Sequence, residues 1–183
     1  MTFGTPVGER EAVKIVHAAL DLGINLIDTA EAYGDGYAET VVGEAITDLP
    51  RDELVIVTKV FNHFNDDGTR YPDLSPEHIA ARCDVSLGRM GIDTIDLYLL
   101  HMYDPLTALD DIAGELDRLH DQGKIRAYGV SNHSVEQLRA RRQGRRALRD
   151  GGAPGGHQLP AGARAPRARH GERVGVQGRP PQE

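Results

Sequence analysis

The stretch NLIDTAEAYG, residues 25–34, carries the features that decide how this chain folds. It opens with a short apolar run, broken only by Asn25, that is typical of a buried strand. Asp28 follows this strand directly, and Tyr33 stands in the loop beyond it. In sheets of parallel strands, active sites are built from residues just past the carboxyl ends of the strands. Asp28 and Tyr33 are therefore candidate functional residues if this strand belongs to such a sheet.

Helices and strands alternate along the chain on both sides of this stretch. Helices are predicted where apolar residues recur at spacings of three and four, in residues 9–22, 39–46, 75–90 and 109–119 and from Ser134 onward. Strands are predicted from short apolar runs, in residues 24–27, 54–58, 95–100 and 125–130. Ser75 before Pro76, and Ser134 three residues before Gln137, are typical helix N-caps. Strands that alternate with helices form parallel sheets, so the predicted fold class is α/β.

Two architectures fit this order, an open doubly wound sheet and a closed (β/α)₈ TIM barrel. No G-x-G-x-x-G motif follows a strand, which argues against the dinucleotide-binding open sheet. Asp28, Lys59, His101 and the pair Ser131-Asn132 each follow a predicted strand, and in a barrel these strand ends gather around one mouth. We therefore predict a partial barrel with strands two to five and a stub of strand one at residues 1–3. A complete barrel takes roughly 250 residues, so strands six to eight are expected to be missing.

The distribution of charge divides the chain near Arg139. Residues 140–183 hold ten arginines and three acidic residues, so they carry +7 while residues 1–139 carry −14 of the total of −7. This tail also has nine glycines, five prolines and no aromatic residue, a composition too poor in apolar side chains to form a core. We predict a barrel domain over residues 1–139 and a disordered tail. The tail is either a polyanion-binding segment or the product of a shifted reading frame; we favour the latter and expect no nucleic-acid partner.

Four motifs follow the predicted strands in order: residues 25–34 with Glu39 behind them, Thr58-Lys59, Leu99-Leu100-His101, and Gly129-Val130-Ser131-Asn132. Together they resemble the ends of barrel strands two to five in the aldo-keto reductase family. The resemblance covers residues 1–139. It implies an NADP-dependent oxidoreductase that reduces a small aldehyde or ketone to an alcohol. It also implies that Ser131 and Asn132, together with Asp28, bind the nicotinamide cofactor NADP(H).

The residues themselves agree with this chemistry. No side chain donates hydride, so carbonyl reduction requires a nicotinamide cofactor beside a proton donor. Tyr33 is the proposed general acid, because an ammonium group near its hydroxyl stabilises the phenolate that remains. Lys59 supplies that ammonium and Asp28 holds it in place. His101 is expected to orient the substrate carbonyl or to share in the proton transfer.

Two other interpretations stay open. The family segments that grip the adenosine phosphate have no match in this sequence, so the chain is alternatively a catalytically inactive fragment, a pseudogene product or a scaffold subunit. An aldolase-like barrel would instead use Lys59 as a Schiff-base nucleophile beside Asp28. The run Asp-Thr-Ala-x-x-Tyr-Gly at residues 28–34 argues against the aldolase. Exposed sheet edges in a partial barrel also predict self-association.

Several residues are expected to have structural roles. Five histidines lack metal-ligand spacing, so we expect packing or solvated side chains and no metal site; they are His17, His63, His78, His120 and His133. Tyr98 is predicted to lie in the barrel wall, and Tyr37 and Tyr103 near the substrate pocket.

The single cysteine and the absence of targeting signals bear on location. Cys83 is predicted to be a small core residue, and without a second cysteine no disulfide can form within the chain. The N-terminus shows no basic segment before an apolar run, and no segment reaches the roughly 18 apolar residues of a membrane span. We therefore expect a cytoplasmic protein without a membrane partner.

Overall fold

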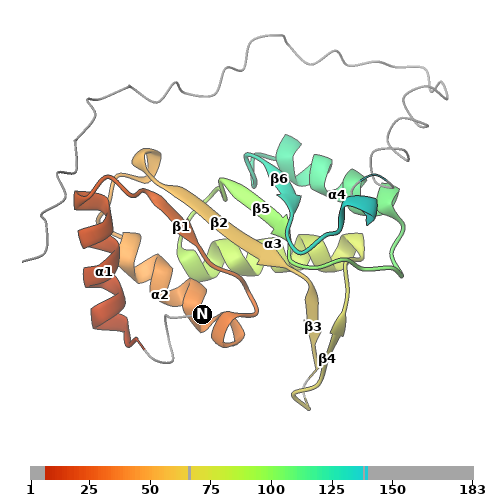
Figure 1. Cartoon of the computed structure of the whole chain (residues 1–183), viewed down its shortest axis with the longest axis horizontal. Helices are drawn as coiled ribbons and strands as arrows, with labels where there is room; N and C mark the ends of the chain where they lie inside the picture. Colours follow the sequence, from red (N-terminus) through yellow and green to blue (C-terminus); the bar gives the residue numbers. More distant parts are fainter. Residues whose placement is uncertain (1–6, 66, 138, 140–183) are drawn as a thin grey trace, which may run out of the picture. The chain divides into compact units, whose positions relative to one another are not determined.

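Four parallel strands form the central sheet, in the order β1-β2-β5-β6 (Figure 1). They are β1 (Leu26–Asp28), β2 (Val55–Val60), β5 (Leu97–Leu100) and β6 (Tyr128–Val130). The computed structural model describes residues 7–65, 67–137 and 139. The predictions of a strand at residues 1–3 and of a disordered tail at residues 140–183 therefore lie outside the described residues. The α/β class with a parallel sheet is confirmed.

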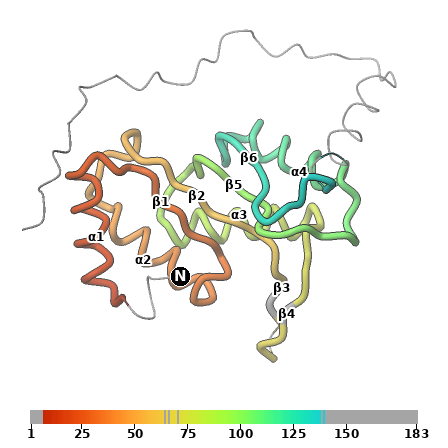
Figure 2. The backbone as a smooth tube through the Cα atoms, viewed as in Figure 1, coloured from red at the N-terminus to blue at the C-terminus, as the bar shows by residue number. Residues whose placement is uncertain are grey.

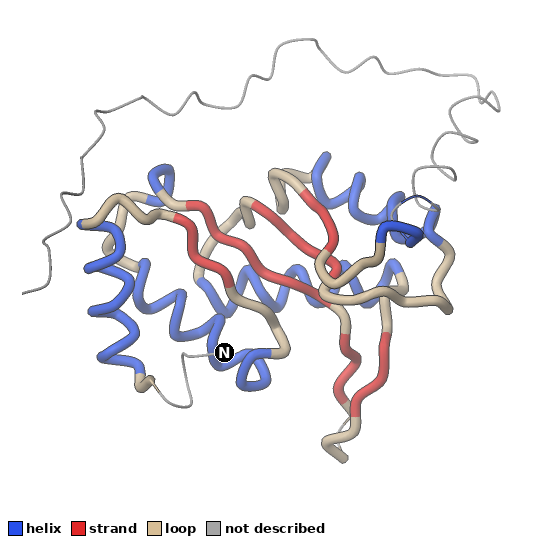
Figure 3. Tube along the Cα trace, viewed as in Figure 1, coloured by secondary structure: helices blue, strands red, loops and turns tan. Residues whose placement is uncertain are grey.

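Four helices lie along one side of this sheet (Figure 3). They are α1 (Glu9–Asp21), α2 (Tyr37–Ile46), α3 (Pro76–Met90) and α4 (Leu109–Asp121). Each packs against the next, α1 on α2, α2 on α3 and α3 on α4. A doubly wound sheet would place helices on both faces and reverse its strand order at one point. Here the strands keep chain order and the helices share a face, which is the arrangement of part of a barrel wall.

The sheet directs alternate side chains to its two faces. On β2, Ile56, Thr58 and Val60 are fully buried and share one face. That face meets the helices, because the Thr58 hydroxyl donates to Glu39 of α2. Lys59 consequently lies on the opposite face, which in a barrel is the inner one.

The two predicted N-caps are confirmed by their hydrogen bonds. Ser75 Oγ accepts from the backbone N–H of His78 at 3.4 Å, one residue before Pro76 begins α3. Ser134 and Gln137 form a reciprocal pair, in which each side-chain oxygen accepts from the other residue's backbone N–H, at 2.7 and 3.2 Å. These contacts need only neighbours in sequence, which is why local patterns predict them.

An antiparallel hairpin that the sequence did not predict follows β2. Its strands are β3 (Asn62–Phe64) and β4 (Arg70–Pro72), and Figure 2 shows it projecting from the end of β2. Each strand has only three residues, too few for an apolar alternation to be recognised. The turn is held by Asp67, whose carboxylate accepts from the backbone and hydroxyl of Thr69, and by Gly68 at φ 81°.

The core lies between the sheet and the helices. The prediction that Cys83 is a core residue is confirmed, since Cys83 and its neighbours on α3, Ile79 and Met90, are at most 2% exposed. Burial, and to a lesser extent the charge of Asp84, raises the pKa of the Cys83 thiol to about 12, so this cysteine is an unreactive core residue. No helix in the described part of the chain is long and apolar enough to span a membrane.

Gly43 of α2 sits where α2 touches α3, and a methyl group there has no room. An ideal Cβ at Gly43 would lie 2.8 Å from the backbone of Arg89 and Met90. We expect Gly43→Ala to lower the free energy of unfolding by about 1–3 kcal/mol, measured by urea denaturation. Gly88→Ala in α3 is the matched control, since nothing lies within 4 Å of its Cβ position, and it should stabilise by about 0.5–1 kcal/mol. Equal effects of the two substitutions would contradict this packing.

Candidate active site

Lys59 and Asp28 form an ion pair at the carboxyl ends of neighbouring strands. In the register of β1 and β2, Asp28 lies beside Val57. Lys59 follows Val57 by two residues on β2, so its side chain lies on the same face of the sheet as that of Val57. Lys59 Nζ donates to both carboxylate oxygens of Asp28, at 2.7 and 2.9 Å, and to the backbone carbonyl of Thr29 at 2.8 Å. Lys59 is 5% exposed, so these acceptors hold a buried ammonium in one position.

Tyr33 reaches the same ammonium from the loop after β1. Its hydroxyl lies 3.4 Å from Lys59 Nζ, which is also 4.9 Å from the centroid of its ring. Tyr33 begins a short 3₁₀ turn, residues 33–36, in which Gly34, Asp35 and Gly36 have positive φ angles of 60°, 53° and 91°. The φ of 91° at Gly36 is a conformation that other residues rarely adopt, and a Cβ there would also overlap the guanidinium of Arg89.

His101 completes the cluster from the end of β5. Its ring packs edge-to-face with that of Tyr33, with centroids 5.6 Å apart. Burial lowers the pKa of His101, the Lys59 charge lowers it further, and Asp28 opposes these effects. The imidazole is therefore neutral at pH 7, with one nitrogen that donates and one that accepts.

The titration of His101 tests this electrostatic arrangement. We expect its imidazole, followed by NMR, to titrate below the unperturbed value of about 6.5. Lys59→Met should raise this pKa, because it removes a nearby positive charge, whereas Asp28→Asn should lower it. Because the folded state binds the proton more weakly, this group should reduce stability as pH falls below about 6.5. A pKa that does not respond to Lys59→Met would contradict the assigned cause.

Ser131 and Asn132 lie at the end of β6, next to His101. The Asn132 side-chain amide donates to the His101 backbone carbonyl at 2.8 Å and to Ser131 Oγ at 3.1 Å. Asn132 adopts a left-handed conformation with φ 55°, which asparagine tolerates better than most residues. All six residues predicted for the site thus lie at adjacent strand ends, and the side chains of Asp28, Tyr33, Lys59 and His101 are linked by the contacts described above.

Glu31 is a residue of this site whose role the sequence did not reveal. It is 1% exposed, and one carboxylate oxygen accepts from the backbone N–H groups of Phe61 and Asn62, at 2.9 and 3.2 Å. The other accepts from Arg82 Nε of α3 at 2.5 Å. Glu31 therefore fastens the loop that carries Tyr33 to the end of β2. Arg82 lies 51 residues further along the chain, so no local pattern could have paired them.

Glu39, like Glu31, holds elements around the site together, from a position in the protein core. It is fully buried and accepts from the Thr58 hydroxyl at 2.7 Å and from Arg89 Nη1 at 2.9 Å. These bonds connect α2 to β2, which carries Lys59, and to α3. The resemblance marked Glu39 as part of a motif without indicating these partners.

The three tyrosines considered beside Tyr33 lie in different places. Tyr98 is fully buried, and its hydroxyl donates to the carbonyl of Ile79 in α3, as expected for the barrel wall. Tyr37 donates to Glu9 of α1 at 3.0 Å, and that hydrogen bond raises the Tyr37 pKa. Tyr103 packs edge-to-face on His133, with centroids 5.8 Å apart.

Comparisons with known proteins identify the family of this chain. A family model described as the Aldo/keto reductase family matches residues 1–147. The aldo-keto reductase YhdN of Bacillus subtilis (strain 168) is 40% identical over 131 residues, 71% of this chain and 39% of that protein. The NADH-specific methylglyoxal reductase of Escherichia coli (strain K12) is 40% identical over 129 residues, 64% of this chain and 40% of that protein.

Solved structures show the same relationship. An aldo/keto reductase from Klebsiella pneumoniae, in complex with NADP and acetate, aligns with a TM-score of 0.64 at 36% identity. The alignment covers 72% of this chain and 43% of that chain. The chain spans about two fifths of the length of the curated relatives it matches. Since the family model matches most of its residues, the chain belongs to the aldo/keto reductase family.

Proposed function

We propose that this chain carries the proton-transfer half of an NADP-dependent carbonyl reductase, with Tyr33 as the general acid. The observation that supports this proposal best is the position of Lys59 Nζ, 3.4 Å from the Tyr33 hydroxyl and bonded to both oxygens of Asp28. A lysine ammonium has three N–H groups. In this site the three N–H groups of Lys59 are directed to Asp28, Thr29 and Tyr33. The ammonium therefore has a fixed orientation, in which it contacts the Tyr33 hydroxyl.

Tyr33 gives its hydroxyl proton to the substrate carbonyl oxygen as that oxygen gains negative charge. The phenolate left behind is stabilised by the Lys59 ammonium, whose own charge is balanced by Asp28. His101, neutral at pH 7, donates a hydrogen bond from one ring nitrogen to the same carbonyl oxygen and orients it. Glu31 keeps the Tyr33 loop at the end of β2 while the proton moves.

Ser131 and Asn132 suit the carboxamide of a nicotinamide ring. Asn132 uses its amide nitrogen on His101 and Ser131, so its amide oxygen remains as an acceptor, and the Ser131 hydroxyl is a donor. These groups are complementary to the N–H and C=O groups of a carboxamide. The cofactor supplies hydride when bound. One relative is named as NADH-specific, and the solved structure of the Klebsiella pneumoniae relative holds NADP. We propose NADP(H) for this chain.

Two measurements on the full chain test the proposal. NADPH fluorescence should change on titration with the protein, and NADPH absorbance should fall when methylglyoxal, the substrate named for a relative, is added. Parallel titrations with NADH measure the preference between the two cofactors. If neither nucleotide binds, the chain is a non-catalytic scaffold or one part of a larger site.

A Schiff-base role for Lys59 is the competing chemistry. Its amine would have to be uncharged to attack a carbonyl, whereas two carboxylate oxygens at 2.7 and 2.9 Å favour the ammonium. Borohydride added with methylglyoxal should therefore leave the mass of Lys59-containing peptides unchanged. A trapped adduct on Lys59 would favour the aldolase-like mechanism.

A further inference from the structure

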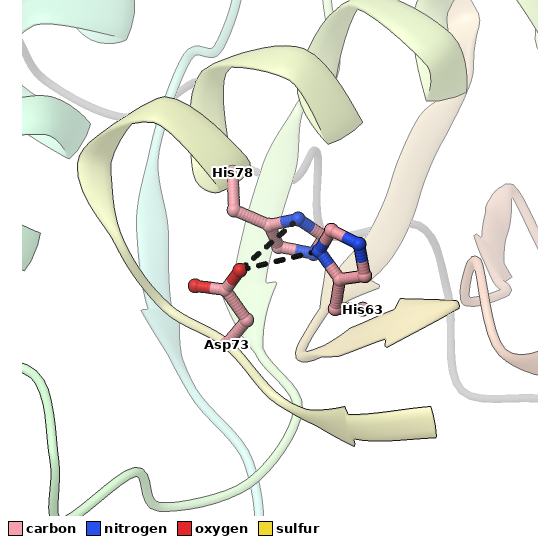
Figure 4. A group of neighbouring side chains, drawn as sticks. All are labelled: His63, Asp73 and His78. Carbon is pink, nitrogen blue, oxygen red and sulfur yellow. Dashed lines mark ion pairs between the residues drawn. The ribbon is translucent and has the colours of Figure 1, made fainter. Parts of the chain in front are cut away.

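Three side chains gather where the β3–β4 hairpin returns to the sheet, outside the Lys59 cluster. His63 lies on β3, Asp73 follows β4, and His78 is in the first turn of α3 (Figure 4). In that view both imidazole rings face the same carboxylate oxygen. These residues are ten and five positions apart in the sequence, a spacing from which we had expected no metal site.

The separations of the two histidine nitrogens from Asp73 match those of a metal-ligand set. Asp73 Oδ2 lies 3.4 Å from His63 Nδ1 and 3.6 Å from His78 Nδ1. One ligand atom from each residue can be chosen so that all lie within 4.8 Å of one another. Two ligands about 2.1 Å from a tetrahedral ion are roughly 3.4 Å apart. The two distances to Asp73 therefore need almost no adjustment to accept an ion.

Two of the three proposed ligands, His78 and Asp73, are oriented by hydrogen bonds that their other polar atoms form with the backbone. His78 Nε2 lies 3.0 Å from the backbone carbonyl of Asn62. A carbonyl only accepts, so Nε2 carries the hydrogen, and in the neutral ring Nδ1 presents its lone pair toward Asp73. Asp73 Oδ1 accepts from the Ser75 backbone N–H at 2.9 Å, which leaves Oδ2 for the histidines. Metal-binding histidines and carboxylates are held in this way by a surrounding shell of hydrogen bonds.

His63 supplies the third ligand and has an unsatisfied nitrogen. Its Nδ1 is buried and, although it lies 3.4 Å from Asp73 Oδ2, it forms no well-aligned hydrogen bond among the described residues. The ring is stacked between Tyr71 and His78, with centroids 4.8 and 5.2 Å away, so its orientation is set by packing. A buried polar atom without a hydrogen-bond partner is rare and calls for an explanation, of which an absent ion is one.

We propose that His63, Asp73 and His78 bind a divalent first-row transition-metal ion, with Zn²⁺ as the probe. Two imidazoles and one carboxylate are ligands that Zn²⁺ accepts, and the 41% exposed side chain of His63 leaves a position open to water. A bound ion would join β3, the segment after β4 and the start of α3. It would thus brace the chain that leaves β2 just beyond Lys59.

The experiment uses the full chain without a histidine tag, treated with EDTA and then freed of it. Zn²⁺ binding is measured by calorimetry at pH 7.5, and Co²⁺ binding by its visible absorption, which reports nitrogen and oxygen ligands in a low-symmetry site. We expect one equivalent to bind, and His63→Gln, Asp73→Asn and His78→Gln each to weaken binding about tenfold or more. His120→Gln is the matched control and should bind as the wild type does, since His120 lies on α4 beside Asp121.

Folding effects are separated from loss of ligands by two features of the design. Asp73→Asn keeps an oxygen to accept from Ser75, and the partly exposed His63 tolerates glutamine, so both variants should match the wild-type melting temperature in EDTA. Zn²⁺ should raise that temperature in the wild type and raise it less, at the same concentration, in these variants. Absence of binding to the wild type, or binding that persists in all three variants, would overturn the proposal.

Discussion

Tyr33→Phe is expected to lower the rate of carbonyl-dependent NADPH oxidation by about 10²- to 10⁴-fold, the usual contribution of a positioned general acid. The substitution removes one oxygen atom, the one 3.4 Å from Lys59 Nζ, and keeps the ring that packs on His101. The affinity for NADPH should stay within about twofold, because the residues proposed to bind the nicotinamide are Ser131 and Asn132. Steady-state kinetics and fluorescence titration on the same preparations measure both quantities.

Tyr37→Phe is the matched control for this prediction. It removes the same atom four residues further along the chain, from a hydroxyl that donates to Glu9 at 3.0 Å. We expect full activity in this variant. If Tyr33→Phe retained activity within about twofold of wild type, Tyr33 would not be the general acid, even though it contacts Lys59.

Arg89→Leu is expected to lower the free energy of unfolding by about 3–5 kcal/mol, measured by urea denaturation. Its partner Glu39 is fully buried, so removal of the guanidinium leaves a carboxylate inside the protein whose remaining donor, among the described residues, is the Thr58 hydroxyl. Activity, where it can be measured, should fall as well, because Glu39 links α2 and α3 to the strand that carries Lys59.

A second substitution and a second ion pair test this explanation. Glu39→Gln in the Arg89→Leu background should restore much of the lost stability, since an amide needs no countercharge and still accepts from Thr58. Lys14→Leu should cost at most about 1 kcal/mol, because the Lys14–Glu11 pair lies on α1 with both side chains exposed. A double variant no more stable than Arg89→Leu alone would show that packing, and not the unpaired charge, is responsible.

The order of helices and strands was predictable from local patterns. Apolar residues recur every three or four positions in the helices and form short runs in the strands, and these periods depend on neighbours in sequence alone. The helix starts at Ser75 and Ser134 were predictable for the same reason, since the capping bonds span three residues. Strand ends were less exact: β5 begins at Leu97, because at Ile95 only an isolated bridge to Ile125 forms.

The positions of the candidate active-site residues were also predictable, although their roles stay proposals. Parallel strands bring their carboxyl ends to one edge, so Asp28, Lys59 and His101 had to lie near one another once the strands alternated with helices. The distances between them could not be read from the sequence. The structure shows that both carboxylate oxygens of Asp28 accept hydrogen bonds from Lys59 and that the His101 ring packs on the Tyr33 ring.

By itself, then, the sequence determined the α/β class and the residues at the ends of the strands, because both follow from short-range periodicity. The sequence favoured a barrel wall over an open sheet, and the tertiary structure confirmed this prediction, since the side on which each helix packs depends on contacts with the next helix. The tertiary structure also determined the ion-pair partners of the buried Glu31 and Glu39, because Arg82 and Arg89 lie 51 and 50 residues away in the sequence. The cluster of His63, Asp73 and His78 exists for the same reason: a hairpin without a recognisable apolar pattern folds back onto the start of α3.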